Sequence, residues 1–325
     1  MRLRITHDTC YDYHPPVDGA LHMAHLRMPD ATCQQVLDHR LRIAPRPATL
    51  RQTRDVRGNW RHFIELATPH SRLAVRATHL VQTVAPAPRA SALPWEAARE
   101  AFVYRAGHPG PAAAQYVFPS VHVHCGPAFV DYARPSFPPG RPLQEAAREL
   151  MLRIHADFRY TPNSTGIHTP AADALQQREG VCQDFSHVML ACLRSLGLAA
   201  RYVSGYLLTQ PPPGQPRLIG SDASHAWVSM YVPDTLAHEA VEEEQHWYDL
   251  CPTNAREGWG TPGEDYVRLA VGRDFADVSP LRGVIQGSQS QALHVGVTVE
   301  PCEALLLTGL PELPEFAPPP PPPPP

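Results

Sequence analysis

Cys182 and His225 are the residues of this chain whose types and surroundings could support covalent chemistry. Cys182 lies in the segment GVCQDF, and His225 lies in the segment DASHAW. An imidazole that reaches a thiol can take its proton, and the resulting thiolate can attack a carbonyl carbon. A third polar group on the far side of the imidazole would hold its tautomer. Together these residues could perform thiol-dependent acyl transfer.

An amphipathic helix is predicted to carry Cys182 in its first turn. Apolar residues recur along one face of a helix of 3.6 residues per turn, and they are Val181, Phe185, Val188, Met189, Cys192, Leu193 and Leu196. Gly180 precedes this run, and Gly197 follows it in the position of a left-handed cap. Because the free amides of a helix N-terminus favour negative charge, we expect the pKa of the Cys182 thiol to be lowered.

A strand is predicted to carry His225 at its N-terminal end. His225, Trp227 and Ser229 alternate with apolar residues, which is the pattern of a strand with two different faces. A second short strand follows in HWYDLCPTN and ends at Pro252. An orienting group for His225 is therefore expected on this second strand.

These motifs resemble the transglutaminase-like superfamily, in the bacterial form whose N-terminal β domain precedes the transglutaminase core. GVCQDF, RYVSGYL, DASHAW and the PTN turn after a tryptophan carry the resemblance, which extends from residue 1 to about 300. It implies an α+β fold in which a papain-like helix bearing the cysteine packs on an antiparallel sheet. It also implies that Cys182 is the nucleophile and His225 the general base and acid. Asp222 and Trp227 are implied to shape the site, although both could be structural.

The third position departs from the pattern of the family. The resemblance implies an aspartate before the Pro-Thr pair, and this chain has Cys251 there. A neutral thiol is a weak acceptor and cannot stabilise an imidazolium as a carboxylate does. Asp249 lies two residues upstream of Cys251 and would share its face of the strand. A bulge or a small shift could therefore bring the Asp249 carboxylate to His225. Asn254 could supply an amide acceptor instead, so three candidates stay open.

Metal chemistry is not expected. VHVHC is predicted to place His122 and His124 on one face of a strand with Cys125 next to them, but zinc sites take three or four ligands, usually from paired clusters. With 18 histidines in the chain, such a group arises by coincidence. The resemblance implies no cofactor, and no acidic loop has the pattern of an EF-hand.

Composition describes an ordinary globular protein. The chain has 325 residues, 43% of them hydrophobic and 18% charged, and a net charge of −4. This balance disfavours nucleic acid and anionic membranes as partners, and no apolar run is long enough to span a bilayer. Seven cysteines without a CxxC pair fit a reducing compartment, and the N-terminus lacks the apolar core of a signal peptide. The expected location is the cytoplasm.

The chain is expected to divide into four parts. Residues 1–90 alternate like strands and predict an N-terminal β-sandwich domain. Residues 91–140 are a proline-rich connecting region with one short helix, and residues 141–300 form the catalytic core. Residues 301–325 end in eight prolines and are expected to be a disordered tail.

The expected function is cysteine-dependent acyl transfer on a peptide or protein amide through a thioester. Attack of water on the thioester would make the protein a protease or amidase, and attack of a primary amine would make it a transglutaminase. Two other classes stay open. One is a binding module that keeps the fold without catalysis, because Cys251 replaces the orienting aspartate. The other is a zinc-dependent hydrolase built on VHVHC.

Overall fold

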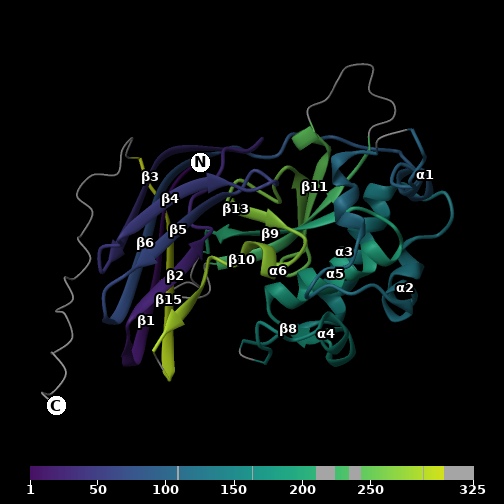
Figure 1. The fold of residues 1–325 in the computed structure, drawn as a ribbon. Coiled ribbons are helices and arrows are strands. Elements are labelled where there is room, and N and C mark those ends of the chain that lie inside the picture. Colours follow the sequence, from purple (N-terminus) through teal and green to yellow (C-terminus); the bar gives the residue numbers. More distant parts are fainter. Residues whose placement is uncertain (108–109, 163, 210–223, 234–242, 288, 304–325) are drawn as a thin grey trace, which may run out of the picture.

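A computed structural model describes residues 1–107, 110–162, 164–209, 224–233, 243–287 and 289–303. A β-sandwich lies at one end of the molecule and helices lie at the other. A separate five-stranded sheet lies between them (Figure 1). In the described part of the chain no helix is both long and apolar enough to cross a membrane.

The N-terminal part is a sandwich of two four-stranded antiparallel sheets, as predicted. One sheet has the strand order β15, β1, β6 and β3, which are Ser290–Pro301, Arg2–Val17, His70–Thr83 and Gln34–Ala44. The other has the order β14, β2, β5 and β4, which are Leu281–Gln286, Gly19–Ala24, Trp60–Leu66 and Thr49–Arg54. Alternate residues of both sheets, among them Val17, Leu66 and Val75, form a buried core between them.

Two strands from the C-terminal end of the chain complete this sandwich. β15 pairs along β1, with Ile5 opposite Val299, and β14 pairs along β2. The prediction of a strand at Leu293–Val299 is confirmed, but its assignment to the catalytic core, and so the core boundary at residue 300, is wrong. Alternation reveals that a segment is a strand, whereas its partner is set by the fold.

The core contains a five-stranded antiparallel sheet of order β12, β11, β10, β9 and β13. These strands are Arg256–Trp259, Trp247–Cys251, Ser224–Tyr231, Ala200–Leu207 and Tyr266–Gly272. The described helices are α1 Trp95–Glu100, α2 Pro127–Ala133, α3 Leu143–Asp157, α4 Ala171–Gln177, α5 Cys182–Ser195 and α6 Phe275–Val278. Short elements are η1 Ala112–Val117, η2 Arg134–Ser136, η4 Glu243–His246 and the bridge of β7 Arg159–Tyr160 with β8 Glu179–Gly180.

Helix α5 is buried on nearly all sides, and its polar residues Ser186, His187 and Arg194 are buried as well as its apolar face. It packs on β9 and β10, while α2, α3 and α4 cover it from the other side. Phe185, Met189 and Leu193 are all at least 98% buried. Each such side chain contributes roughly 1.5–3 kcal/mol through removal from water. The helix that carries Cys182 is therefore a fixed central element of the core.

Residues 91–140 are more than the irregular connection that their prolines predict. Ala98 of α1 and Phe129 of α2 are buried in the same core as α5. Proline at the start of α2 is compatible with a helix, because the first helical residues have no intrahelical partner for their amides. This segment is part of the core.

The sandwich joins the core along the free edge of β13. The side-chain amide of Gln34 donates to the carbonyl of Arg268 at 2.9 Å and accepts from its N–H at 2.8 Å. Asn59 makes the same pair with Val271, at 2.7 and 2.8 Å. These amides satisfy backbone groups that an edge strand otherwise leaves open. Ile5 of β1 and Val267 of β13 belong to one buried apolar cluster, which extends the joint.

Three histidines inside the sandwich make its stability depend on pH. His39 and His79 stack at 4.5 Å, and His62 lies 6.1 Å from His39. Burial lowers the pKa of His39 and His62 to about 4 and that of His79 well below its usual 6.5. The unfolded chain therefore binds protons between about pH 6.5 and 4 that the folded chain excludes.

We expect the thermal midpoint to fall by about 5 °C or more as the pH is lowered from 7 to 4.5. Circular dichroism at a series of pH values measures this change. His79→Asn should make the fall smaller, whereas His124→Asn, at an exposed position, is the control and should leave it unchanged. Equal pH dependence in the wild type and His79→Asn would contradict the explanation.

Candidate active site

Cys182 is the first residue of α5, as predicted, and a carboxylate holds the turn before it. Asp184 accepts the N–H of Val181 at 2.8 Å and the hydroxyl of Thr165 at 2.6 Å through the same oxygen. A Cβ on Gly180 would lie 2.5 Å from that oxygen, so only glycine fits there. Glycine, cysteine and aspartate in GVCQD thus form one folded unit. The capping role of Asp184 was not predicted, although an acidic residue three positions after a helix cap is a known signal.

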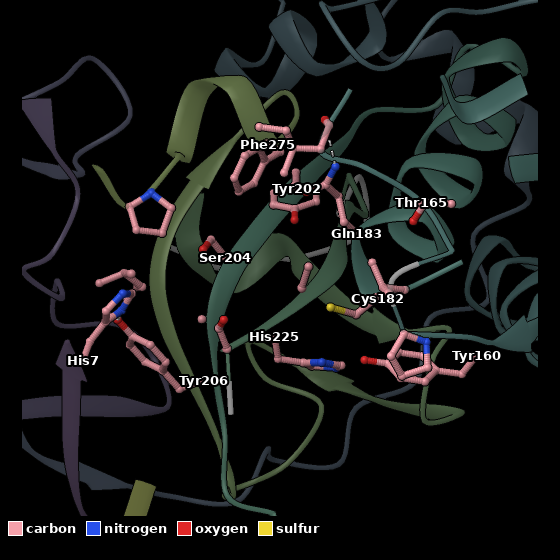
Figure 2. A pocket seen from close by; sticks show the side chains of 18 residues that line it. His7, Tyr160, Thr165, Cys182, Gln183, Tyr202, Ser204, Tyr206, His225 and Phe275 are labelled. Atoms are coloured by element: carbon pink, nitrogen blue, oxygen red, sulfur yellow. Dashed lines mark hydrogen bonds between the residues drawn. The ribbon is translucent and has the colours of Figure 1, made fainter. Parts of the chain in front are cut away.

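Cys182 and His225 both line one cavity of about 360 Å³. Figure 2 shows the Cys182 sulfur and the His225 ring next to each other, both pointing into this cavity. Side chains from the sandwich and the core complete the wall, and those labelled are His7, Tyr160, Thr165, Gln183, Tyr202, Ser204, Tyr206 and Phe275. The structure therefore brings together the two residues that the sequence analysis selected.

The electrostatics of Cys182 differ from the expectation. The backbone N–H groups of Gln183 and Ala226 favour the thiolate, but burial outweighs them and raises the pKa of the Cys182 thiol to about 12. The partial charge of a helix terminus offsets only part of the cost of burying an anion. The prediction of a lowered pKa is wrong, and the resting group is a thiol.

The imidazole of His225 is held between aromatic rings on β10 and β13. Its ring centroid lies 6.3 Å from that of Trp227 and 5.7 Å from that of Tyr266. Burial lowers its pKa to about 4, so the resting ring is neutral. Nε2 lies 3.1 Å from the sulfur of Cys251. Nδ1 is then the nitrogen that remains for Cys182.

The three candidates for the third position have different surroundings. Cys251 contacts Nε2 of His225 at 3.1 Å, and the side-chain nitrogen of Asn254 lies 3.4 Å from the same atom. The carboxylate of Asp249 instead accepts the indole N–H of Trp227 at 2.9 Å. Asp249 and Cys251 point to the same face of β11, but one pleat separates them. The predicted contact of Asp249 with the ring is not made.

Trp227 and Asp222 were the residues predicted to shape the site. Trp227 is buried beside His225, and its ring approaches Gly205, where a Cβ would lie 2.5 Å away. Asp222 lies outside the described residues. Tyr266 was not predicted, since it comes from a distant strand and only pairing of β13 with β9 brings it to the ring.

The VHVHC segment is not a strand and is occupied by other contacts. The His122 ring stacks on that of His187 at 5.6 Å, and the backbone N–H of His122 donates to the carboxylate of Asp274 at 2.7 Å. Among the described residues, no three histidine, cysteine or acidic side chains are arranged to hold a metal ion. The acyl-transfer chemistry described above requires none.

Comparisons with known proteins agree with this arrangement. The bacterial transglutaminase-like N-terminal region matches residues 3–82, and the transglutaminase-like superfamily matches residues 132–252. An uncharacterized protein of Mycobacterium tuberculosis is 40% identical over 308 residues, which are 93% of this chain and 93% of the relative. An uncharacterized protein of Mycobacterium leprae is 30% identical over 302 residues, which are 92% of this chain and 98% of the relative.

A solved structure shares the fold over nearly the whole length. It is described as a "Putative Cysteine Protease" from Cytophaga hutchinsonii and superimposes with a TM-score of 0.65 at 19% identity, covering 94% of this chain and 92% of that one. At this identity the likeness shows the fold alone. The two family matches and the two mycobacterial relatives extend over most of the chain. This chain belongs to the transglutaminase-like superfamily, in the bacterial form with its own N-terminal β region.

Proposed function

We propose that this protein is an enzyme that transfers the acyl group of an amide or peptide through a thioester on Cys182. The observation that supports this most directly is that Cys182 and His225 line the same cavity, with Nε2 of the ring already in contact with Cys251. That arrangement leaves Nδ1 to take the thiol proton. The proposed general activity is thiol-dependent acyl transfer. The acceptor of the acyl group is either water or a primary amine.

In the first half-reaction, Nδ1 of His225 takes the proton of Cys182 while the sulfur attacks the carbonyl carbon of the substrate. The tetrahedral intermediate collapses when the imidazolium returns this proton to the leaving amine or ammonia. A thioester remains on Cys182. Water or a primary amine then attacks the thioester, His225 takes the proton of the attacking group and returns it to the thiolate, and the free enzyme is restored.

The cavity favours a neutral acyl group. None of its lining residues in the described part of the chain is Asp, Glu, Lys or Arg. Placing a charged side chain there would remove it from water without an opposite charge, which costs several kcal/mol. A carboxamide such as that of glutamine, or an apolar side chain beside the scissile bond, fits this lining. Hydroxyls of Tyr202 and Ser204 in the cavity wall could hydrogen-bond such a group.

A second candidate is a binding module that keeps the cavity without catalysis. Two observations favour it: Cys251 replaces the family aspartate, and burial raises the pKa of the Cys182 thiol to about 12. Such a module would bind a peptide in the cavity and leave it unchanged. Formation of a covalent acyl-enzyme separates the two candidates.

We expect the wild type to form a covalent adduct with a glutamine-containing peptide that carries an electrophile at its side chain, and Cys182→Ala to form none. His225→Asn should form the adduct about 10²-fold or more slowly, because the general base is lost. Intact-protein mass spectrometry measures both. Cys125→Ala is the control, since this cysteine is exposed and outside the cavity. Unmodified wild type, or equal modification in Cys182→Ala, would favour the binding module.

Asp249 is expected to stabilise the buried indole of Trp227 as a hydrogen-bond acceptor. We do not expect its carboxylate to affect the protonation of the His225 imidazole. Asp249→Ala should lower the free energy of unfolding by about 1–3 kcal/mol, because the buried indole N–H of Trp227 loses its acceptor. Asp249→Asn keeps an acceptor oxygen and should leave the pH dependence of acyl transfer unchanged. Denaturant unfolding and rates measured across pH test the two statements. An altered pH profile in Asp249→Asn would show that the carboxylate acts on His225.

A further inference from the structure

Two cysteines lie near the His225 ring. Cys182 lines the same cavity, and the sulfur of Cys251 is 3.1 Å from Nε2. A thiol is a poor acceptor, so a neutral Cys251 would hold the tautomer of the ring weakly. A thiolate at the same place would be a charged acceptor, comparable to a carboxylate.

Polar hydrogens surround the Cys251 sulfur. Its hydrogen bond is with Nε2 of His225 at 3.1 Å, and the Tyr266 hydroxyl and the backbone amides of Thr253 and Asn254 are close enough to favour its anionic form. The N–H of Asn254 also donates to the carbonyl of Cys251 at 3.3 Å. The side chain is fully buried, so water does not compete with these groups. Groups of this kind stabilise a buried anion.

The charged and titratable groups that face Cys251 come from four other elements. They are His225 on β10, Arg256 on β12, Tyr266 on β13 and Cys182 on α5. Arg256 favours the thiolate, although it is paired with Asp265. Asp249 on β11 is directed to Trp227. Burial acts against this set of donors and raises the pKa of Cys251 above its usual value.

Asn254 is the weaker alternative as orienting group. Its side chain is exposed, and its amide nitrogen lies 3.4 Å from Nε2 while donating to the Tyr266 hydroxyl at 2.9 Å. An amide carries no charge and cannot offset that of an imidazolium. Cys251 is closer to the ring and fully buried.

We propose that Cys251 is the positioning residue for His225 and acts as a thiolate, so that the site becomes reactive only after the unit of Cys182, His225 and Cys251 has lost one proton. This inference rests on the proposed acyl-transfer function. It identifies a regulation by pH that a carboxylate at position 251 would not produce.

The proton count explains the difference. The resting unit is a thiol, a neutral imidazole and a second thiol, and it carries no net charge. Loss of one proton to solvent leaves one negative charge, and transfer of the Cys182 proton to the ring then gives thiolate, imidazolium and thiolate. With an aspartate at position 251, the same negative charge would be present at all pH values above the pKa of the carboxylate. The substrate step itself is unchanged, since Cys251 neither attacks nor leaves.

The test is the rate at which iodoacetamide alkylates Cys182 between pH 5 and 10, followed by peptide mass spectrometry. In the wild type we expect the rate to rise by up to about tenfold for each step of one in pH. The rise should stop once Cys182, His225 and Cys251 together have released one proton. Cys251→Asp should move this rise to lower pH by about one unit or more, and Cys251→Ser should make alkylation at pH 9 at least about tenfold slower. Cys192→Ala is the control, because this buried thiol does not face the ring, and it should keep the wild-type profile.

Tyr266→Phe provides a test that leaves position 251 intact. It removes one donor to the Cys251 sulfur and should move the rise to higher pH, with little change in the core. A Cys251→Ser or Cys251→Asp profile that coincides with that of the wild type would overturn the inference, as would an unchanged profile in Tyr266→Phe when the Cys251 variants do not fold. Failure of the proposed function is a different result: Cys182 would show the expected alkylation profiles, but no acyl-enzyme would form. A wild type whose Cys182 resists alkylation at every pH would overturn both.

Discussion

Burial of helix α5 is the constraint on which the site depends. The helix packs between the core sheet and three other helices, and this packing sets where its first residue lies relative to β10. Asp184 ties the turn before it, and glycine at position 180 leaves room for that carboxylate. Cys182 is therefore placed by the core as a whole. A nucleophile on a rigid element needs little reorganisation before reaction.

The same burial has a cost for the chemistry. It favours the neutral forms of both Cys182 and His225, which is the opposite of what an ion pair requires. The backbone N–H groups of Gln183 and Ala226 offset part of this cost at one sulfur. The groups on the far side of the imidazole must supply the rest. The identity of the residue at position 251 is therefore more important here than in a solvent-exposed site, where water would stabilise either charge.

The sandwich contributes to the site through its joint with the core. Side-chain amides of Gln34 and Asn59 complete the free edge of β13, and β13 carries Tyr266 to the ring. From the sandwich itself, His7 reaches the cavity wall and hydrogen-bonds Tyr206 at 2.7 Å. The first and last described strands, β1 and β15, pair with each other within this sandwich.

Local periodicity in the sequence was sufficient to place Cys182 at the start of a helix and His225 at the start of a strand. A helix or strand with one apolar face repeats its apolar residues at a fixed spacing, which can be recognised in the sequence. Periodicity also predicted five strands of the sandwich, β1, β3, β5, β6 and β15, but not β2, β4 or β14. The motifs indicated the family. Only the tertiary structure decided that Cys251 and not Asp249 faces the ring, that β14 and β15 close the sandwich, and that residues 91–140 join the core. Each of these depends on contacts between distant segments, and a strand carries no local record of which partner it will pair with.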